Sequence, residues 1–464
     1  MKKTLLNILI LLSLTGCSLD IPYDNQFSDP DAITSPETGR ELLASGYSSL
    51  PAIGYDLAIM SDDFTPTYWA SRNPSLTNQY NWQPSALHDL AISIWPQFYS
   101  VIATTNALTE RIAGIVAENE ADRREVADLQ SEAETLKAYC YFQLLRLFAS
   151  DPAEGLDKDG IILKDKVEMQ NLPRSTVGQT IDEIRRLLES ALKRGHSGSS
   201  ASWLTTDATT LLLAQVELYA GNHGRAAELA SSLVDAKGYS CFEPSAYRLM
   251  WEGTTSPAQI FIYDDPDNAQ SYYIGIVYDT TTGDYFSVAP ALAASFTESD
   301  CRAEWTLCPF YSTGLGHQDF IGKYNRLRRE KREISFINKL RMAEALFVAA
   351  EALALSGGGG AECTKAIDML NKFLEARGAE PVSTSLTGDA LLKEILAQKH
   401  KEFLGEGNRY FDLKHYRATV LSETANRIPA AGDYRWLWPI PKDEYLYNEN
   451  MTQNPSWPKD SFDD

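Results

Sequence analysis

Apolar residues recur at helical spacing through much of the chain, and the pattern is clearest towards the C-terminus. Within 341–355 they follow one another at steps of four, three and four, which places them on one face of a helix. A second helix is predicted at 366–377, and it ends at Gly378, a residue type that commonly terminates helices. The two segments therefore predict a pair of consecutive helices. The apolar positions of the first helix are Met342, Leu346, Ala349 and Leu353.

A similar pair of helical patterns lies at 207–236, with a short turn at 222–224 between the two helices. Small side chains at facing positions would let the two backbones approach closely. The pair resembles a tetratricopeptide-repeat unit. Its landmark positions are occupied here by Ala214, Leu218, Tyr219, Gly221 and Ala226, and Ala230 is a further small residue.

Further helices are expected at 94–114, 122–148 and 177–193. The spacing between these segments is irregular, which excludes a simple repeat array. The predicted fold class is therefore all-α: a tetratricopeptide-like scaffold of helical pairs that carries loop-rich, partly β insertions.

Two stretches break the helical pattern. Short β-prone runs separated by Gly, Pro and Asp turns occupy 240–325, and the segment 50–90 is loop-rich and aromatic. We interpret both as insertions on the helical scaffold. Binding residues are commonly carried by loops that a rigid scaffold positions, so a ligand site is expected in these two stretches.

The first residues have the features of a secretory signal peptide. Lys2 and Lys3 precede an apolar run that is too short to remain as a transmembrane helix. Cys17 follows Leu-Thr-Gly, which resembles the bacterial lipobox, in which the cysteine is lipidated and becomes the new N-terminus. Each buried methylene of such a lipid contributes about 0.8 kcal/mol to anchoring. The predicted layout is a signal peptide at 1–16, a lipidated tether at 17–40 and a single helical domain at 41–464, with parts at 41–240, 241–330 and 331–464.

The net charge of −21 is spread along the 464 residues, so nucleic acid, whose phosphates would be repelled, is not an expected partner. Five cysteines remain after Cys17, an odd and sparse set that forms no disulfide framework. Cys301 and Cys308 could pair locally or remain free thiols. The six histidines are scattered, and no zinc-protease, hydrolase or dinucleotide motif is present. No catalytic residue, metal site or cofactor is predicted.

Seven motifs, in the right order, are similar to those of the SusD/RagB family of Bacteroidetes outer-membrane lipoproteins. The resemblance covers nearly the whole mature chain and is most specific in its C-terminal half. The chain departs from the family pattern at Lys137, Leu374, Gln398, Lys399 and His415. The changes at Gln398, Lys399 and His415 weaken a charge pair of the family and are expected to affect the packing more than the fold. The matching residues are Trp95, Tyr99, Ile102 and Asn106; 131–152; 173–176; Arg341, Glu344 and 350–352; Leu370, Asn371, Arg377 and Gly378; Glu402, Phe403, 405–407, Arg409, Asp412 and Leu413; and 437–441 with 453–455.

The resemblance implies a SusD-like fold and a binding function without catalysis. It implies a protein held at the cell surface on the outer membrane, contacting the membrane through its lipid alone. The implied partner is a SusC-like TonB-dependent β-barrel that imports what this protein captures. The implied ligand is a nutrient, with a polysaccharide or oligosaccharide as the first choice.

Charged residues of opposite sign alternate on the C-terminal helices that carry these motifs. Glu344 and Glu351 are seven residues apart and share a helix face, so a carboxylate pair for glycoside hydrolysis is one interpretation. The other is a network of ion pairs between helices, because buried charges are costly unless they are paired. We favour the ion-pair network. The residues expected in it are Arg341, Glu344, Glu351, Arg377, Glu402 and Arg409.

Sugars stack their CH-rich ring faces on aromatic side chains, while polar groups bind the hydroxyls. Aromatic residues outside helices are therefore the signal to seek, and both insertions supply them among polar neighbours. By resemblance, ligands bind on a platform of loops from these two regions that faces the transporter. The residues expected to bind are Trp69, Tyr80, Trp82, Tyr285 and Tyr311, with Arg72 and Asn81 as polar partners.

Three alternatives to glycan binding stay open. A RagB-like protein would bind peptides through backbone hydrogen bonds and shape. A surface glycoside hydrolase would use Glu344 or Glu351 and turn over a bound oligosaccharide. A helical-repeat scaffold would bind only protein. The loops that would select the ligand are the least patterned part of the chain.

Overall fold

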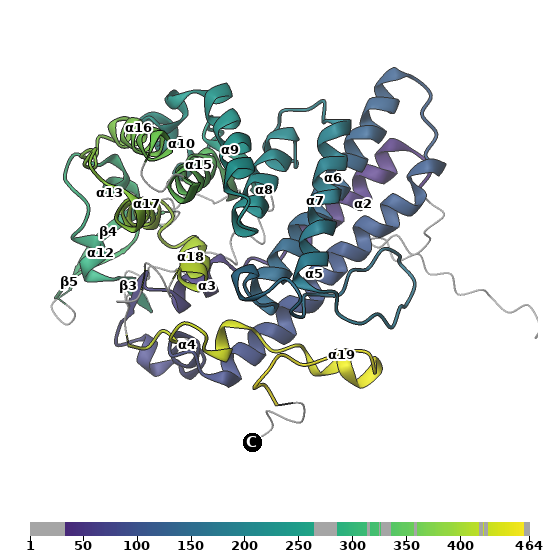
Figure 1. Cartoon of the computed structure of the whole chain (residues 1–464), viewed down its shortest axis with the longest axis horizontal. Coiled ribbons are helices and arrows are strands. Elements are labelled where there is room, and N and C mark those ends of the chain that lie inside the picture. Colours follow the sequence, from purple (N-terminus) through teal and green to yellow (C-terminus); the bar gives the residue numbers. More distant parts are fainter. Residues whose placement is uncertain are drawn as a thin grey trace, which may run out of the picture.

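Consecutive helices pack side by side along most of the chain (Figure 1). The computed structural model describes residues 33–263, 285–312, 316–323, 325, 336–356, 360–416, 421 and 426–458. The long helices are α2 (Pro36–Ser48), α5 (Pro84–Arg111), α6 (Glu120–Phe148), α7 (Val177–Arg194), α8 (Thr206–Tyr219), α9 (His223–Lys237), α15 (Met342–Ser356), α16 (Ala361–Arg377) and α17 (Gly388–Glu402).

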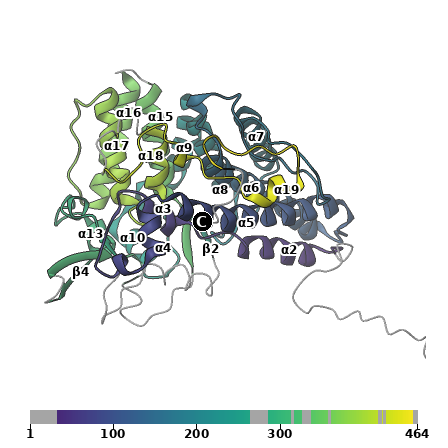
Figure 2. The same ribbon diagram turned by 90° about the horizontal axis from the view of Figure 1, so that it is seen from below.

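The row of helices follows the order of the chain, from α5 through α6, α7 and α8 to α9. Helix α15 then packs against α9, so the C-terminal third continues a row that the N-terminal half began. On its other sides α15 contacts α16 and α17, and in the view from below α2 runs alongside α5 (Figure 2). The predicted all-α class and the tetratricopeptide-like packing of helical pairs are confirmed.

Local signals in the sequence explain where several of these helices begin and end. Thr176 and Gln179 form a reciprocal capping box at the start of α7, and Asn119 caps α6 by accepting from the backbone of Asp122. Helix α16 ends at Gly378, whose φ of 68° lies in the left-handed region that glycine adopts without strain.

Short strands and short helices make up the remaining elements. Three antiparallel two-stranded sheets are present among the described residues: β1 with β3, β2 with β6 and β4 with β5. The strands are β1 (Phe64–Pro66), β2 (Gln259–Tyr263), β3 (Phe286–Val288), β4 (Leu307–Ser312), β5 (Gly316–Ile321) and β6 (Ile337–Arg341). The short helices are α3 (Gly54–Met60), η2 (Ala70–Arg72), α4 (Pro74–Tyr80), η3 (Ile112–Gly114), η4 (Pro152–Glu154), η5 (Tyr239–Phe242), α10 (Pro244–Trp251), α12 (Pro290–Ala293), α13 (Cys301–Thr306), α18 (Asn408–Tyr416), η6 (Tyr434–Trp436) and α19 (Lys442–Tyr447).

The segment 50–90 is more helical than predicted. Helices α3 and α4 and the first turns of α5 occupy it, and α5 begins ten residues before the predicted start at 94. These two short helices escaped a periodicity test because each has only seven residues. For α4, the sequence signals of a helix start were the capping residue Asn73 and the proline that follows it, Pro74.

The predicted signal peptide at 1–16, Cys17 and most of the tether lie outside the described residues. The helices within the described ranges lack a stretch long and apolar enough to cross a membrane. Cys301 and Cys308 do not form a disulfide, and within the described ranges Cys140, Cys241 and Cys363 are not in disulfides either.

Candidate ligand-binding site

Strand pairing brings the two aromatic insertions together. The backbone N–H and the Oγ1 of Thr67 both point to the carbonyl oxygen of Tyr285, at 2.9 and 3.1 Å. This contact extends the β1–β3 register, in which Pro66 lies opposite Phe286. Residues that are more than two hundred positions apart in the sequence therefore share one surface.

Exposed aromatic rings gather at this junction. Tyr68 is 55 % exposed and Tyr285 is 39 % exposed, while Trp69 is half-buried. The rings of Tyr68 and Trp69 meet edge to face, with centroids 5.4 Å apart. Arg72 is exposed, and its Nη1 donates to the Tyr68 hydroxyl at 2.8 Å. We call Tyr68, Trp69, Arg72 and Tyr285 the aromatic patch.

The turn that carries the patch is held from beneath. Asn73 caps α4 by accepting from the backbone of Leu76, and Thr77 Oγ1 donates to the carbonyl of Ala70 in η2 at 2.8 Å. Asn81, one of the predicted polar partners, is exposed, and its Nδ2 donates to the Thr77 carbonyl at 2.9 Å. Its amide oxygen is the group of that side chain that remains for a ligand.

Tyr80 does not offer a free ring face. The guanidinium of Arg427 lies 3.6 Å from the ring centroid, and Phe286 packs near it with centroids 5.7 Å apart. Arg427 also donates to the carbonyl of Tyr80 at 2.8 Å. These contacts occupy much of the half-buried Tyr80 ring and leave it less able to stack on a ligand than an exposed ring, and its role in binding stays a prediction.

The prediction that Trp82 stacks on a ligand is wrong for this structure. Trp82 is fully buried, and its ring stacks on Tyr410 with centroids 5.5 Å apart and an interplanar angle of 8°. Its indole N–H donates to the carbonyl of Met60 at 2.8 Å. The backbone at Trp82 has a φ of 55°, and this left-handed turn between α4 and α5 directs the side chain into the core.

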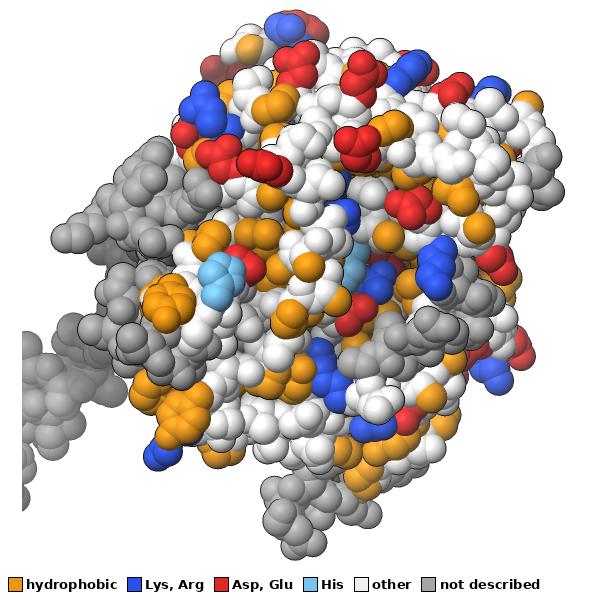
Figure 3. Space-filling model, turned by 90° about the vertical axis from the view of Figure 1, so that its left-hand side faces the viewer, with side chains coloured by type: hydrophobic (Ala, Val, Ile, Leu, Met, Phe, Trp, Pro, Cys, Tyr) orange, Lys and Arg blue, Asp and Glu red, His pale blue; other side chains and the backbone are white. Residues whose placement is uncertain are grey.

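Tyr311 stands apart on the β4–β5 hairpin. It is 72 % exposed and lies opposite His317 in the strand register. Strand β5 packs against β3, which begins directly after Tyr285, so the β4–β5 hairpin lies beside the strand that follows Tyr285. Figure 3 shows the side of the molecule where β5, α12 and α13 lie, with exposed hydrophobic side chains gathered along its lower left part.

Buried ion pairs fasten the patch to the C-terminal helices. Asp62, just before β1, accepts from the guanidinium of Arg409 at 2.7 and 2.8 Å. Asp63 receives Nε2 of His400 at 2.7 Å and the backbone N–H of Gly405 at 2.9 Å. Burial opposes ionisation of Asp62, but His400 and Arg409 outweigh it and hold its pKa well below the usual range.

Asp62, Asp63 and His400 could in principle share a metal ion, because their ligand atoms lie within 4.8 Å of one another. Each of the three already has a protein partner, however, and Arg409 brings a positive charge to the same place. The chemistry of this cluster is therefore that of a buried ion-pair network that positions β1.

The predicted network of ion pairs between C-terminal helices is confirmed. Glu402 is fully buried, and it pairs with Arg341 and Arg377 at 2.8 Å each. Glu351 pairs with Lys399 at 2.8 Å. Glu344 differs, because its carboxylate accepts from the Gln215 amide and from a backbone N–H and has no ion pair among the described residues.

Two features of the surface and interior were not predicted from the sequence. Tyr68 lay within the aromatic stretch but was not chosen over its neighbour Trp69, although an adjacent aromatic pair was a signal for a patch. The second is a cavity between α6, α8, α15 and α18, which is lined by residues from segments too distant for any sequence pattern to connect.

Two family models match the chain. A model described as "Starch-binding associating with outer membrane" matches residues 48–194, and one described as "SusD family" matches residues 320–427. A curated relative, the SusD-like protein P2 of Formosa agariphila, is 26% identical, and the alignment covers 96% of this chain and 98% of that protein.

Solved structures share the fold. A SusD superfamily protein from Bacteroides vulgatus has a TM-score of 0.76 at 21% identity, covering 92% of this chain and 100% of that one. A SusD superfamily protein from Bacteroides thetaiotaomicron has the same TM-score at 19% identity, covering 91% and 100%. A SusD-like carbohydrate binding protein from Bacteroides vulgatus has a TM-score of 0.75 at 18% identity, covering 90% and 97%.

The fold is a tetratricopeptide-like row of helices that carries short strands and loops. Within that fold class, the chain belongs to the SusD/RagB family, as the sequence motifs predicted. The family consists of nutrient-binding proteins associated with the outer membrane.

Proposed function

We propose that this protein is a lipid-anchored subunit at the cell surface that binds a glycan and passes it to a SusC-like TonB-dependent outer-membrane barrel. The proposal includes a signal peptide at 1–16, lipidation at Cys17, a tether to residue 40 and a single helical domain from 41 to 464. Capture rests on contact alone, with no catalytic step.

The aromatic patch is the observation that carries the proposal. Two exposed tyrosines, a half-buried tryptophan and an exposed guanidinium from two distant segments lie on a support of buried ion pairs. Stacking on a sugar ring needs exposed aromatic faces, and binding of hydroxyls needs donors such as Arg72 beside them. Exposed Tyr311 on the adjacent hairpin would extend the contact to a longer chain of sugars.

The printed descriptions of related proteins agree with this choice of ligand. One matching family model is named for starch binding, and one structural relative is called a carbohydrate binding protein. The net charge of −21 favours neutral ligands over polyanions such as nucleic acid.

A binding screen tests the proposal. The purified protein is offered a panel of neutral and acidic polysaccharides in affinity gels, and a pool of peptides in parallel. Retardation by at least one polysaccharide is expected. Binding of peptides alone, turnover of a bound oligosaccharide, or binding of neither ligand class would contradict it in favour of the peptide, hydrolase or protein-scaffold alternative.

The anchor has its own test. Metabolic labelling of cells with an alkyne analogue of palmitate is expected to label the wild-type protein and not Cys17→Ser. Equal labelling of both, or of neither, would remove the lipid anchor from the proposal.

A further inference from the structure

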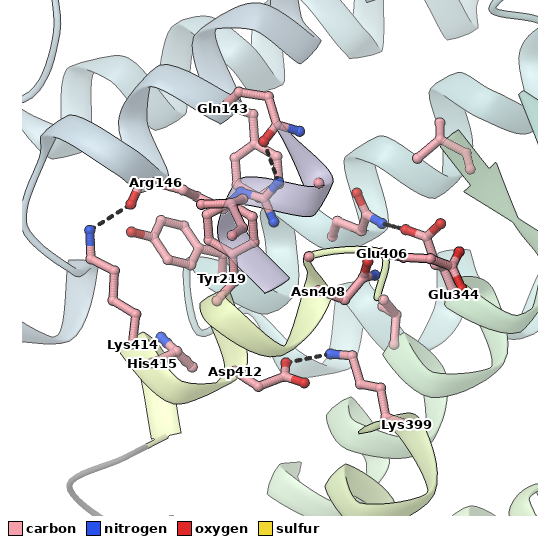
Figure 4. Close-up of a pocket in the computed structure, with 18 of the residues that line it drawn as sticks. Gln143, Arg146, Tyr219, Glu344, Lys399, Glu406, Asn408, Asp412, Lys414 and His415 are labelled. Carbon is pink, nitrogen blue, oxygen red and sulfur yellow. Dashed lines mark hydrogen bonds and ion pairs between the residues drawn. The ribbon is translucent and has the colours of Figure 1, made fainter. Parts of the chain in front are cut away.

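A cavity of about 170 Å³ lies between α6, α8, α15 and α18, away from the aromatic patch. One water molecule requires about 10–15 Å³ of such space, so the cavity can hold a ligand considerably larger than a single water molecule. Several lining side chains, among them Gln215 and Tyr219, are half-buried rather than sealed, which leaves the cavity open to solvent. Figure 4 shows the charged side chains that surround it.

Arg146 forms one wall without an acidic partner in the described part of the chain. Its guanidinium lies between the rings of Phe142 and Phe411, 4.3 and 3.8 Å from their centroids. One nitrogen donates to Oε1 of Gln143 at 2.8 Å, and the described residues offer no hydrogen-bond partner to the buried Nε. Burial lowers the pKa of Arg146 to about 10, which is the sign of a charge short of compensation.

Lys414 adds a second positive charge on the same side (Figure 4). Its Nζ donates to the carbonyls of Arg146 and Ala149 at 2.5 and 3.0 Å, and the described residues supply no carboxylate to it. Burial lowers its pKa to about 8, although Asp151 attracts the charge. Asp151 itself is paired with His415 at 2.5 Å.

Glu344 stands on the opposite side of the cavity (Figure 4). Its carboxylate accepts from Gln215 at 2.6 Å and from the backbone N–H of Arg341. The guanidinium of Arg341 pairs with Glu402 and Glu406 and makes no ion pair with Glu344, although its positive charge favours the ionised form of that carboxyl. Burial raises the pKa of Glu344 to about 7.

A second negative charge remains at the base of the cavity. Lys399 is shared by two acids, Glu351 at 2.8 Å and Asp412 at 2.7 Å, so one cation balances only one of them. Oδ2 of Asp412 is buried and has no hydrogen-bond partner among the residues that the structure describes. The internal pairing thus leaves positive charge on the Arg146 side and negative charge on the Glu344 and Asp412 side.

We propose that this cavity is a second ligand site that takes a small zwitterion of the α-amino acid or dipeptide class. The carboxylate of the ligand would bind Arg146 and Lys414, and its ammonium would bind Glu344 and the free oxygen of Asp412. Glu344 and Asp412 already attract the charge of Arg146 without forming an ion pair with it, so a neutral ligand would leave each of these charges without a direct partner. An ion of one sign would be repelled by one side. The hydroxyl of Tyr219 also lacks a hydrogen-bond partner within the described ranges. This hydroxyl and the rings of Phe142 and Phe411 line the cavity and would contact the body of the ligand.

Calorimetric titration of the purified full chain with four probes tests the ligand class. L-leucine and glycyl-L-leucine keep both charges, leucine amide lacks the carboxylate, and N-acetyl-leucine lacks the ammonium. At least one of the two zwitterions is expected to bind, and removal of either charge is expected to weaken binding at least tenfold. Equal binding of the single-charge derivatives, or no binding of either zwitterion, would overturn the proposal.

Variants locate the site. Arg146→Gln and Glu344→Gln are each expected to weaken zwitterion binding at least tenfold, whereas Arg123→Gln, an exposed position on the same helix as Arg146, leaves it unchanged. Circular dichroism and thermal unfolding check that the variants fold, and Lys414→Met replaces Arg146→Gln if that variant does not. Unchanged binding in the folded cavity variants would overturn the proposal. Polysaccharide binding at the aromatic patch, measured on the same proteins, is expected to persist, so the two sites succeed or fail separately.

Discussion

Trp69 and Trp82 are thirteen residues apart and differ both in backbone conformation and in burial. Trp69 sits before η2 in ordinary helical geometry and stays half-buried at the patch. Trp82 has a φ of 55° and points inward, between Tyr410 and Trp436. An aromatic residue in a predicted loop can therefore be assigned to binding only when the structure shows that its side chain points to the surface and not into the core.

Replacing Trp82 with alanine should affect stability rather than ligand recognition. The substitution leaves a large cavity and is expected to lower the free energy of unfolding by about 3–5 kcal/mol. Tyr68→Ala, which removes an exposed ring, is expected to leave the unfolding midpoint nearly unchanged. Urea denaturation followed by circular dichroism measures both. A loss as small for Trp82→Ala as for Tyr68→Ala would contradict the buried position.

Residue type and spacing identified the stretch that carries the patch but could not rank its members. Trp82, Tyr80 and Trp69 look equivalent in the sequence, because burial depends on Tyr410 and Arg427, which are more than three hundred positions away. The cavity between α6, α8, α15 and α18 was not predictable from the sequence. Its charged groups lack ion-pair partners only because, in the fold, Lys399 pairs with Glu351 and Arg341 pairs with Glu402.

At the scale of elements, a buried charge network joins β6, α16 and α17. Arg341 from β6 and Arg377 from α16 both bind Glu402 at the end of α17. Alternating charges on predicted helices indicated this network, because unpaired charges of that kind could not be buried. Long helices with capping signals, such as α6 and α7, were likewise predictable, whereas seven-residue α3 and α4 were too short to show a period.

Removal of the central carboxylate should weaken this junction. Glu402→Gln leaves two buried guanidinium groups without their shared partner and is expected to destabilise the protein by about 3–5 kcal/mol at pH 7. Burial opposes ionisation of Glu402, but Arg377 and Arg341 outweigh it and lower the pKa from 4.5 to about 2. A lowered pKa means that this stabilisation is present above pH 4.5 and is lost as the pH falls towards 2.

Urea titrations at several pH values test that expectation. The difference between wild type and Glu402→Gln should be greatest at pH 7 and should shrink below pH 4.5. Glu228→Gln, which removes an exposed pair with Arg225, is the matched control and should cause no measurable loss. A difference that stays constant down to pH 3 would show that the carboxylate charge does not hold the junction.

At the scale of the whole molecule, one continuous row of helices carries the patch and encloses the cavity. Helix α15 links the two halves by packing against α9, α16 and α17, and the network around Asp62 and Asp63 ties the patch to the C-terminal helices. A rigid support of this kind reduces the entropy lost when a ligand orders a binding surface. We therefore expect the exposed side chains to determine which ligand is bound and the helices to hold those side chains in position.

The affinity of patch variants for a polysaccharide found in the binding screen tests this account most directly. Calorimetric titration of Tyr68→Ala with Trp69→Ala in one chain is expected to show at least a tenfold rise in Kd, about 1.4 kcal/mol, with an unchanged unfolding midpoint. Tyr447→Ala, which removes another highly exposed ring on α19, should bind as the wild type does. A double variant that binds the polysaccharide with wild-type affinity would contradict the assignment of recognition to the aromatic patch.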